Sequence, residues 1–174
     1  MDQKFPLFIV TGASGVGKTT VMHELRGLLP DFVVLSTDND NFGSTSNKLD
    51  YQDRYNLLFH FAAASLKSKI GTIICGTVMP WDVKKCDTFQ NFSQVCFINL
   101  HCNDETRNNR LRNRDDKDIW TDEKLKDHKE FARWLLDNSE TAYNPPMPTI
   151  DTTVTPPAEV AMQIREYVID KWSK

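Results

Sequence analysis

The sequence lacks the features that mark several large classes of protein. No window approaches the ~20 consecutive apolar residues that a membrane-spanning helix needs. Residues 1–11 contain no basic segment followed by a long apolar stretch, so no signal peptide is expected. The net charge of −3 provides no overall basic field of the kind that nucleic-acid-binding proteins use. We therefore expect a cytoplasmic protein, monomeric or homodimeric, that binds neither nucleic acid nor membrane.

Cysteine and histidine are also poorly placed for a disulfide framework or a metal site. The four cysteines are Cys75, Cys86, Cys96 and Cys102, and none belongs to a Cys-x-x-Cys pair. Two of them lie inside apolar runs, where a thiol behaves as a small hydrophobic group. The four histidines are scattered and form no pair at i and i+4 with a nearby acid. We expect all four cysteines to be reduced.

Short apolar runs alternate along the chain with segments of helical spacing. The runs predict strands at 5–11, 32–35, 72–75, 95–100 and 148–153. Helices are predicted at 18–29, 49–69, 104–114, 121–138, with Thr121 as N-cap, and 156–172. This alternation is typical of a parallel sheet covered on both faces. We predict an α/β fold of three layers with about five strands. It forms one domain over residues 1–174, with a small helical lid at about 103–120.

One segment carries a specific chemical signal. Gly12-Ala-Ser-Gly-Val-Gly-Lys18-Thr19 matches G-x-x-x-x-G-K-[ST] at every fixed position, between a predicted strand and a predicted helix. The glycines let successive backbone N–H groups point at phosphate oxygens. Lys18 brings a positive charge to the β- and γ-phosphates, and the Thr19 hydroxyl is the expected magnesium ligand. We predict that ATP and Mg²⁺ bind here, with contacts from Gly12, Ser14, Gly15, Val16, Gly17, Lys18, Thr19 and Thr20.

The phosphate loop alone does not separate motors, GTPases and kinases. With three further segments, the chain resembles the P-loop small-molecule kinases, which include nucleoside-monophosphate, shikimate and gluconate kinases. These segments are Ser36-Thr37-Asp38-Asn39-Asp40, Arg110-Leu-Arg-Asn-Arg114 and Ile150-Asp151-Thr152. The resemblance covers nearly the whole chain, and the three segments gain weight from their order and spacing. It implies transfer of the γ-phosphoryl group of ATP to a small molecule.

Two arginines of the polar helix predicted at 104–114 are candidates for ATP contacts and catalysis. Arg110 and Arg114 are four residues apart, which places them on one helix face. In nucleotide kinases, such a pair closes over ATP, with one guanidinium near the adenine and the other at the phosphates. Their charge would stabilise the transferring group. The alternative is a solvated charged face, with Arg114 balanced by the aspartates that follow it. Arg107 and Arg112 are weaker candidates.

The acceptor side offers two aspartates after the second predicted strand, Asp38 and Asp40. Ligands of open α/β sheets bind beyond the carboxyl ends of strands. If the acceptor is a hydroxyl, Asp38 can orient it and take its proton, or hold magnesium through water. A phosphate acceptor needs no base and would use arginines, for which Arg54 and Arg133 are candidates. Both aspartates could instead simply form an Asx-turn.

The stretch 76–82 leaves the third predicted strand and should line the acceptor pocket from the other side. Trp81 could stack there on a base or sugar, or it could pack in the core. The chain departs from the kinase pattern here, because this strand does not end in the acid of a standard magnesium motif. It also lacks the Glu-Arg-Ser run of deoxynucleoside kinases. Asp38 is therefore the candidate for the second magnesium contact.

Three functions agree with these features. A nucleoside or nucleotide is the first acceptor class, because of the spaced arginines. A sugar-like or other hydroxyl-bearing metabolite is the second, because of the aspartates. A regulatory ATPase or nucleotide-dependent switch is a rival from another class. The short chain and the kinase-like arginine segment disfavour the switch.

The substitution Asp38→Asn separates the two acceptor models. If Asp38 orients a hydroxyl, we expect kcat to fall roughly 100-fold or more, because general-base catalysis contributes on that scale, with ATP affinity nearly unchanged. Steady-state kinetics with the preferred acceptor, together with ATP titration, measure both quantities. A small effect on kcat would instead favour a phosphate acceptor.

Overall fold

A computed structural model describes residues 4–37 and 48–173 of the chain. It contains one sheet with the strand order β2-β3-β1-β4-β5, in which every neighbouring pair is parallel. The strands are β1 (Leu7–Thr11), β2 (Phe32–Ser36), β3 (Gly71–Cys75), β4 (Val95–His101) and β5 (Thr149–Asp151). The strand predictions are confirmed, with each boundary within two residues of its expected position.

The long helices also agree with the sequence predictions. They are α1 (Lys18–Leu28), α2 (Tyr51–Leu66), α4 (Asp104–Arg112), α5 (Asp122–Asp137) and α6 (Pro157–Trp172). Thr121 is the N-cap of α5, and its hydroxyl accepts a hydrogen bond from the Lys124 amide. The sequence did not predict α3 (Pro80–Val83) or the 3-10 helices η3 (Phe89–Asn91) and η4 (Lys117–Ile119), which are too short to show a helical period.

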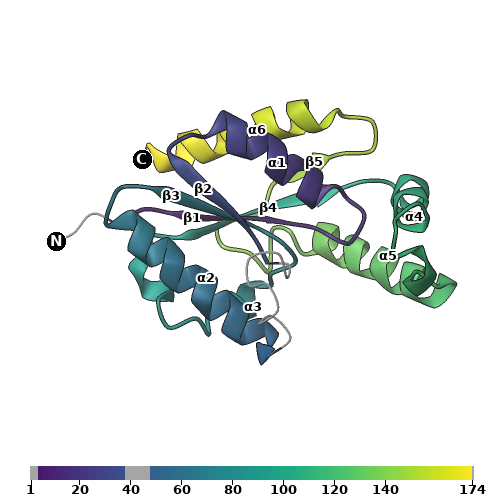
Figure 1. Cartoon of the computed structure of the whole chain (residues 1–174), viewed down its shortest axis with the longest axis horizontal. Coiled ribbons are helices and arrows are strands. Elements are labelled where there is room, and N and C mark those ends of the chain that lie inside the picture. The colour runs from purple at the N-terminus through teal and green to yellow at the C-terminus, as the bar shows by residue number, and fades with distance from the viewer. Residues whose placement is uncertain (1–3, 38–47, 174) are drawn as a thin grey trace.

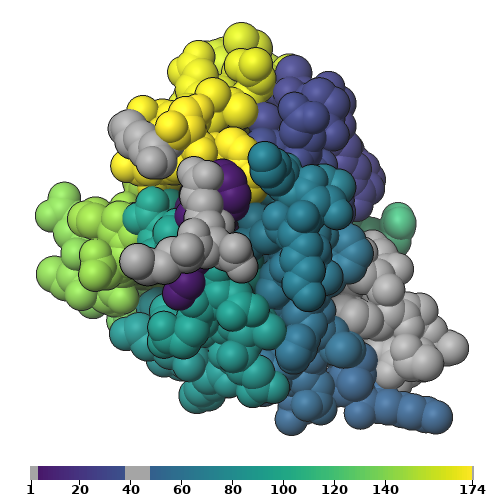
Figure 2. All heavy atoms as spheres, turned by 90° about the vertical axis from the view of Figure 1, so that its left-hand side faces the viewer, coloured from purple at the N-terminus to yellow at the C-terminus, as the bar shows by residue number. Residues whose placement is uncertain are grey.

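Helices cover both faces of the sheet, as Figure 1 shows, which confirms the three-layer prediction. Along β1, Phe8 and Val10 belong to the core under α1 and α6, whereas Leu7 and Ile9 belong to the core shared with α2. Figure 2 shows α6 and α1 on one side of the molecule and α2 on the other. All four cysteines are buried and free. Among the described helices, none combines the length and the apolar character needed to cross a bilayer.

The sheet order makes the carboxyl end of β1 the natural ligand position. The chain passes from β1 to β2 at one edge of the sheet and later returns to add β4 on the other side of β1. In open α/β sheets, ligands bind where the direction of strand addition reverses. The glycine loop 12–17 and the start of α1 lie at this point.

Gly71, the first residue of β3, allows a close approach between strands. A Cβ atom at Gly71 would lie 2.2 Å from the Phe32 ring. That ring is held against Trp172 of α6, with centroids 4.9 Å apart. Phe32 therefore has little room to move away, and any side chain at position 71 would disturb this end of the core.

We expect Gly71→Ala to destabilise the protein by about 2 kcal/mol, the usual scale of overpacking in a tight core. This corresponds to a fall in Tm of roughly 4–8 °C for a chain of this size. The matched control is Gly27→Ala in α1, where an added Cβ would meet nothing within 4 Å. There we expect a gain of up to about 1 kcal/mol, because alanine favours helix over glycine. Thermal and urea unfolding measure both, and equal effects at the two positions would contradict this account.

Candidate nucleotide and acceptor site

The phosphate loop is shaped by three glycines with positive φ. The φ angles are 146° at Gly12, 85° at Gly15 and 99° at Gly17, a region that side-chain-bearing residues rarely adopt. Gly17 is the N-cap of α1, and no side chain of the described residues caps this helix end. The N–H groups of the first turn are therefore available to an anion, and the helix dipole favours negative charge there. The loop thus fits a bound phosphate chain.

Neighbouring elements approach the loop too closely for larger residues. A Cβ at Gly12 would lie 2.5 Å from the carbonyl oxygen of Leu100 at the end of β4. At Gly15, it would lie 2.9 Å from Leu111 Cγ and 3.0 Å from Arg107 Cγ, both on α4. The loop backbone is therefore held between β4 and α4.

Lys18 and Thr77 meet at one carbonyl of the loop. The Lys18 Nζ atom donates to the carbonyl oxygens of Gly12, at 2.7 Å, and Ala13, at 3.0 Å. The Thr77 hydroxyl donates to the same Gly12 oxygen at 3.2 Å. Thr77 follows the carboxyl end of β3, where the usual acid is missing. A hydroxyl from the segment after β3 therefore contacts the phosphate loop.

Two cavities open beside the loop and share Gly15, Gly17 and Arg114. The larger has a volume of about 650 Å³. Its loop side is formed by Ser14, Gly15, Gly17, Lys18 and Thr19. Its opposite side is formed by Thr37, Tyr51, Arg54, Tyr55 and Thr77. The larger cavity therefore has room for a second ligand group next to the phosphate loop.

The smaller cavity, of about 310 Å³, lies on the other side of the loop. Its apolar lining comes from Val16, Val21, Pro157 and Val160, and its polar lining includes Thr20, Arg110, Thr152 and Thr155. An apolar slot beside a phosphate loop suits an adenine ring.

Arg110 is fixed at this smaller cavity by Thr152, the residue after β5. The Arg110 Nη2 atom donates to the Thr152 carbonyl at 2.7 Å. Thr152 is buried, and its hydroxyl donates to the carbonyl of Val16 at 2.8 Å. These contacts join α4, the end of β5 and the phosphate loop. Arg110 is therefore held at the smaller cavity, and Arg114 alone of the pair borders both cavities.

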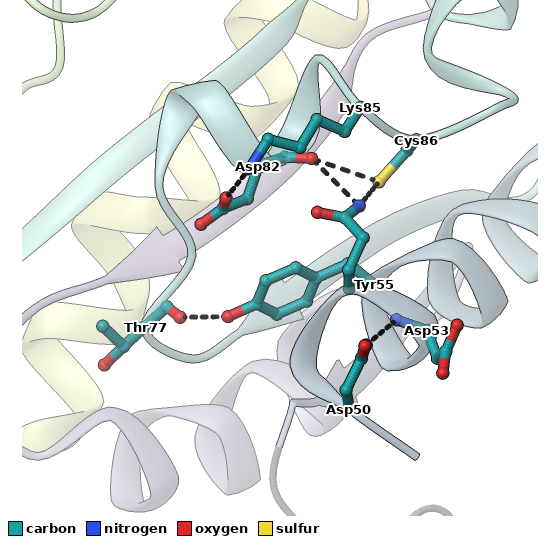
Figure 3. A network of polar contacts seen from close by, with 8 residues as sticks. Asp50, Asp53, Tyr55, Thr77, Asp82, Lys85 and Cys86 are labelled. Carbon is teal, nitrogen blue, oxygen red and sulfur yellow. Dashed lines mark hydrogen bonds and ion pairs between the residues drawn. The ribbon is translucent and has the colours of Figure 1, made fainter.

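The far wall of the larger cavity is held in place by contacts between α2 and the segment after β3 (Figure 3). The Tyr55 hydroxyl donates to the Thr77 carbonyl at 2.9 Å, and Gln52 Nε2 donates to the Asp82 carbonyl at 3.2 Å. Burial, with a smaller contribution from Asp82, raises the pKa of Tyr55 to about 12. The phenol therefore stays protonated at neutral pH and remains a hydrogen-bond donor.

The same wall also contains a charged and an aromatic side chain from α2 and a threonine that follows β2. The Arg54 guanidinium lies over the Tyr51 ring, 5.4 Å from its centroid. Thr37 packs against Gly76, where a Cβ would lie 1.8 Å from the Thr37 hydroxyl oxygen. Position 76 must therefore be glycine if β2 and β3 are to end this close together. The wall offers a cation, aromatic faces and hydroxyl groups.

The structure brings most of the predicted site residues together, with two exceptions on the acceptor side. Trp81 packs against Trp134 at a centroid distance of 5.7 Å and is 49% exposed. The Arg133 side chain is 81% exposed and pairs with Asp137 at 3.6 Å. Neither borders the larger cavity. Asp38 and Asp40 lie outside the described residues; they follow Thr37, which borders that cavity.

Sequence reasoning expected the stretch 76–82 to line the acceptor pocket and 150–152 to form a kinase-like segment, but it gave no role to four individual side chains that line the cavities: Thr77, Thr152, Tyr51 and Tyr55. Thr77 and Thr152 each come just after the carboxyl end of a strand, a position where ligands are expected. Tyr51 and Tyr55 lie three residues before and one residue after Arg54 on α2, so an aromatic flank to the arginine was visible in the sequence. None of these residues belongs to a specific motif.

No group of three histidine, cysteine or acidic side chains within residues 4–37 and 48–173 could hold a metal ion by itself. Thr19 borders the larger cavity beside Lys18. This fits magnesium that is bound mainly through nucleotide phosphates with few protein ligands, as is usual for this ion.

The glycine loop at the switch point of a parallel sheet defines the chain as a P-loop nucleotide-binding domain. The family model described as "AAA domain" matches residues 7–135. The chain belongs to this family. A comparison with curated protein sequences finds no match.

Solved kinase structures share the fold along nearly their whole length. A sugar kinase from Janibacter sp. HTCC2649 is 17% identical, with a TM-score of 0.62, 97% of this chain covered and 96% of that one. Shikimate kinase from Acinetobacter baumannii, in complex with shikimate, is 18% identical, with a TM-score of 0.60 and coverages of 98% and 96%. A gluconokinase from Sinorhizobium meliloti 1021 is 17% identical, with a TM-score of 0.61 and coverages of 98% and 96%. The resemblance drawn from the sequence is confirmed for the fold.

The two arginines of α4 should differ in their kinetic effects. We expect Arg114→Met to lower kcat by roughly 100-fold, the scale for removing one group that stabilises transition-state charge. Arg110→Met should mainly raise the KM for ATP, because Arg110 is fixed beside the base cavity. The control is Arg112→Met, whose exposed side chain pairs with Asp122, and it should change neither constant more than about twofold. Equal losses of kcat in all three variants would contradict this assignment.

Proposed function

We propose that this protein is a kinase that transfers the γ-phosphoryl group of ATP to a hydroxyl group of a small metabolite. One observation supports the proposal most: a single cavity of about 650 Å³ is lined by the phosphate loop and by a polar wall that could hold an acceptor. Lys18 and Thr19 lie on one side of that cavity, and Arg54 and Thr77 lie on the other. A simple nucleotide switch has no need for such a compartment.

The residues of the loop side would hold the triphosphate. Lys18 would exchange the carbonyl oxygens of Gly12 and Ala13 for the β- and γ-phosphates, which are stronger acceptors because they are charged. Mg²⁺, bound with the Thr19 hydroxyl as a ligand, would neutralise charge on the same phosphates. Arg114 would compensate charge on the transferring group, and closure of a lid at about 103–120 would exclude water.

The chemical step requires a proton acceptor. The bond between the γ-phosphorus and the bridging oxygen of ADP breaks, and a bond from that phosphorus to the acceptor oxygen forms. The acceptor hydroxyl loses its proton in this step. We propose Asp38 as the group that orients the hydroxyl and takes the proton, because it directly follows Thr37 at the cavity wall.

The acceptor that best fits the wall is a small hydroxyl compound with an anionic group. Arg54 supplies a positive charge, while the hydroxyls of Thr77 and Tyr55 lie nearby. The nucleotide model rested on the spaced arginines of α4, and Arg110 is fixed at the smaller cavity. The other candidate acceptor contacts, Trp81 and Arg133, do not border the larger cavity. The similar solved structures named sugar kinase, shikimate kinase and gluconokinase also support a hydroxyl acceptor.

A nucleoside acceptor is the second candidate, and one observation favours it. Tyr51 borders the cavity and is 72% exposed, so its ring offers a surface on which a base could stack. The remaining sequence expectations belong to the same proposal: a single cytoplasmic domain, monomeric or homodimeric, that acts on ATP and a small molecule.

The test is ATP turnover in the presence of four compound classes: sugars, hydroxy acids, nucleosides and nucleoside monophosphates. We expect ADP release to rise at least tenfold with one or a few hydroxy acids or acidic sugars. Arg54→Met should raise the acceptor KM by roughly 10-fold or more, because a charge-assisted hydrogen bond is lost. The same variant should leave the KM for ATP unchanged. Lys18→Met serves as the inactive control.

Two results would contradict the proposal. Stimulation by nucleosides alone would favour the second candidate. ATP hydrolysis that no acceptor stimulates would favour a regulatory ATPase.

A further inference from the structure

Arg107 is a fully buried arginine on α4, with an exposed fraction of 0%. Arginine is almost never fully buried unless it is paired, because removing its charge from water is costly. Sequence reasoning gave this residue little weight compared with Arg110 and Arg114. Its position therefore calls for a physical reason.

The guanidinium of Arg107 is only partly compensated. Its Nη2 atom donates to Asp104 Oδ1 at 2.7 Å. Asp104 also accepts from Lys129 Nζ at 2.9 Å, and these hydrogen bonds hold the pKa of the Asp104 carboxyl below its usual value. One carboxylate is thus shared between two cations. The Arg107 Nε and Nη1 atoms have no hydrogen-bond partner among the described residues.

The side-chain stem of Arg107 lies directly under the phosphate loop. A Cβ atom at Gly15 would lie 3.0 Å from Arg107 Cγ and 3.1 Å from the Arg107 carbonyl oxygen. Gly15 has a φ of 85°, a conformation that the loop needs in order to present its N–H groups. Arg107 and Leu111 therefore form the floor on which this part of the loop rests.

The positive charges of Arg107 and Lys18 both affect His128, a histidine of α5. His128, on the inner face of α5 beside the buried Leu125 and Ala132, has an imidazole whose pKa is lowered. Burial is the main cause, and the positive charges of Lys18 and Arg107 add to it. Both positive charges thus act on one imidazole of α5.

We propose that Arg107 is a positioning residue for the triphosphate: a buried cation that supports Gly15 from below and adds positive potential to the phosphate loop without touching the nucleotide. The proposal rests on the proposed function, because it assumes that the loop binds ATP. It assigns a role in binding to a buried charge that would otherwise only lower stability. Arg107 differs in this from Arg110 and Arg114, which border the cavities.

The test compares Arg107→Met, Arg107→Lys and the control Arg112→Met. Calorimetric titration gives their affinities for the Mg²⁺ complex of the non-hydrolysable analogue AMP-PNP and for adenosine, and urea unfolding gives their stability. Arg107→Met should be about as stable as the wild type, because the remaining Asp104 carboxylate is 43% exposed and keeps its ion pair with Lys129.

The expected signature is a loss of affinity that depends on phosphate. Arg107→Met should bind AMP-PNP about tenfold more weakly, which equals ~1.4 kcal/mol, and should bind adenosine unchanged. Arg107→Lys should recover most of the AMP-PNP affinity because it retains the charge. Arg112→Met removes an exposed charge from the same helix and should change the affinity for AMP-PNP less than about twofold.

Several outcomes would overturn the inference. One is an unchanged affinity of Arg107→Met for AMP-PNP. Another is a loss of affinity for adenosine as large as the loss for AMP-PNP, which would indicate a purely structural role. A wild-type protein that binds no AMP-PNP would overturn both this inference and the proposed function. Binding by the wild type and by Arg107→Met alike would overturn only the inference.

If Arg107→Met does not fold, Asp104→Asn decides the question. This variant removes the counter-ion but keeps the Arg107 cation, so stability should fall while AMP-PNP affinity holds or rises. A fall in AMP-PNP affinity in folded Asp104→Asn would contradict the role of the buried charge.

Discussion

The structure depends on a stretch of backbone that has no room for side chains. Gly12 lies against the last residues of β4, and Gly15 rests on α4, at distances that would place any Cβ in contact with its neighbours. Positive φ angles at both positions add a second reason for glycine. The start of α1, the two cavities and the contact with α4 all lie along this stretch of backbone.

Hydrogen bonds to the phosphate loop also connect the two halves of the site. The carbonyl of Gly12 accepts hydrogen bonds from Lys18 and from the Thr77 hydroxyl, and the Thr77 carbonyl accepts one from Tyr55. A continuous set of contacts thus runs from the phosphate loop to the acceptor wall on α2. On the other side, Thr152 joins Val16 to Arg110. Each compartment is fixed to the loop by a threonine at the end of a strand.

The fold and the phosphate loop could be predicted from sequence because their signals are local. Apolar runs give the strands, and residues 12–19 form a complete motif. The acceptor wall could not be predicted in the same way, since Tyr55 and Thr77 are 22 residues apart and meet only in the folded sheet. Arg107 looked like one of several surface arginines, because burial of a charged residue in a polar helix leaves no periodic signal. Trp81 was proposed as a stacking residue because of its position after the third strand, but its ring packs against Trp134 and does not border the larger cavity.

Nucleotide phosphates are expected to bind on the loop between β1 and α1. An ¹H–¹⁵N NMR titration of the protein with the Mg²⁺ complex of AMP-PNP tests this binding most directly. We expect saturable shifts that are largest at the amides of Gly15, Gly17, Lys18 and Thr19, with smaller shifts at Thr152. Lys18→Met should weaken the response. Saturable shifts confined to another face of the sheet, or none at millimolar nucleotide, would contradict the account.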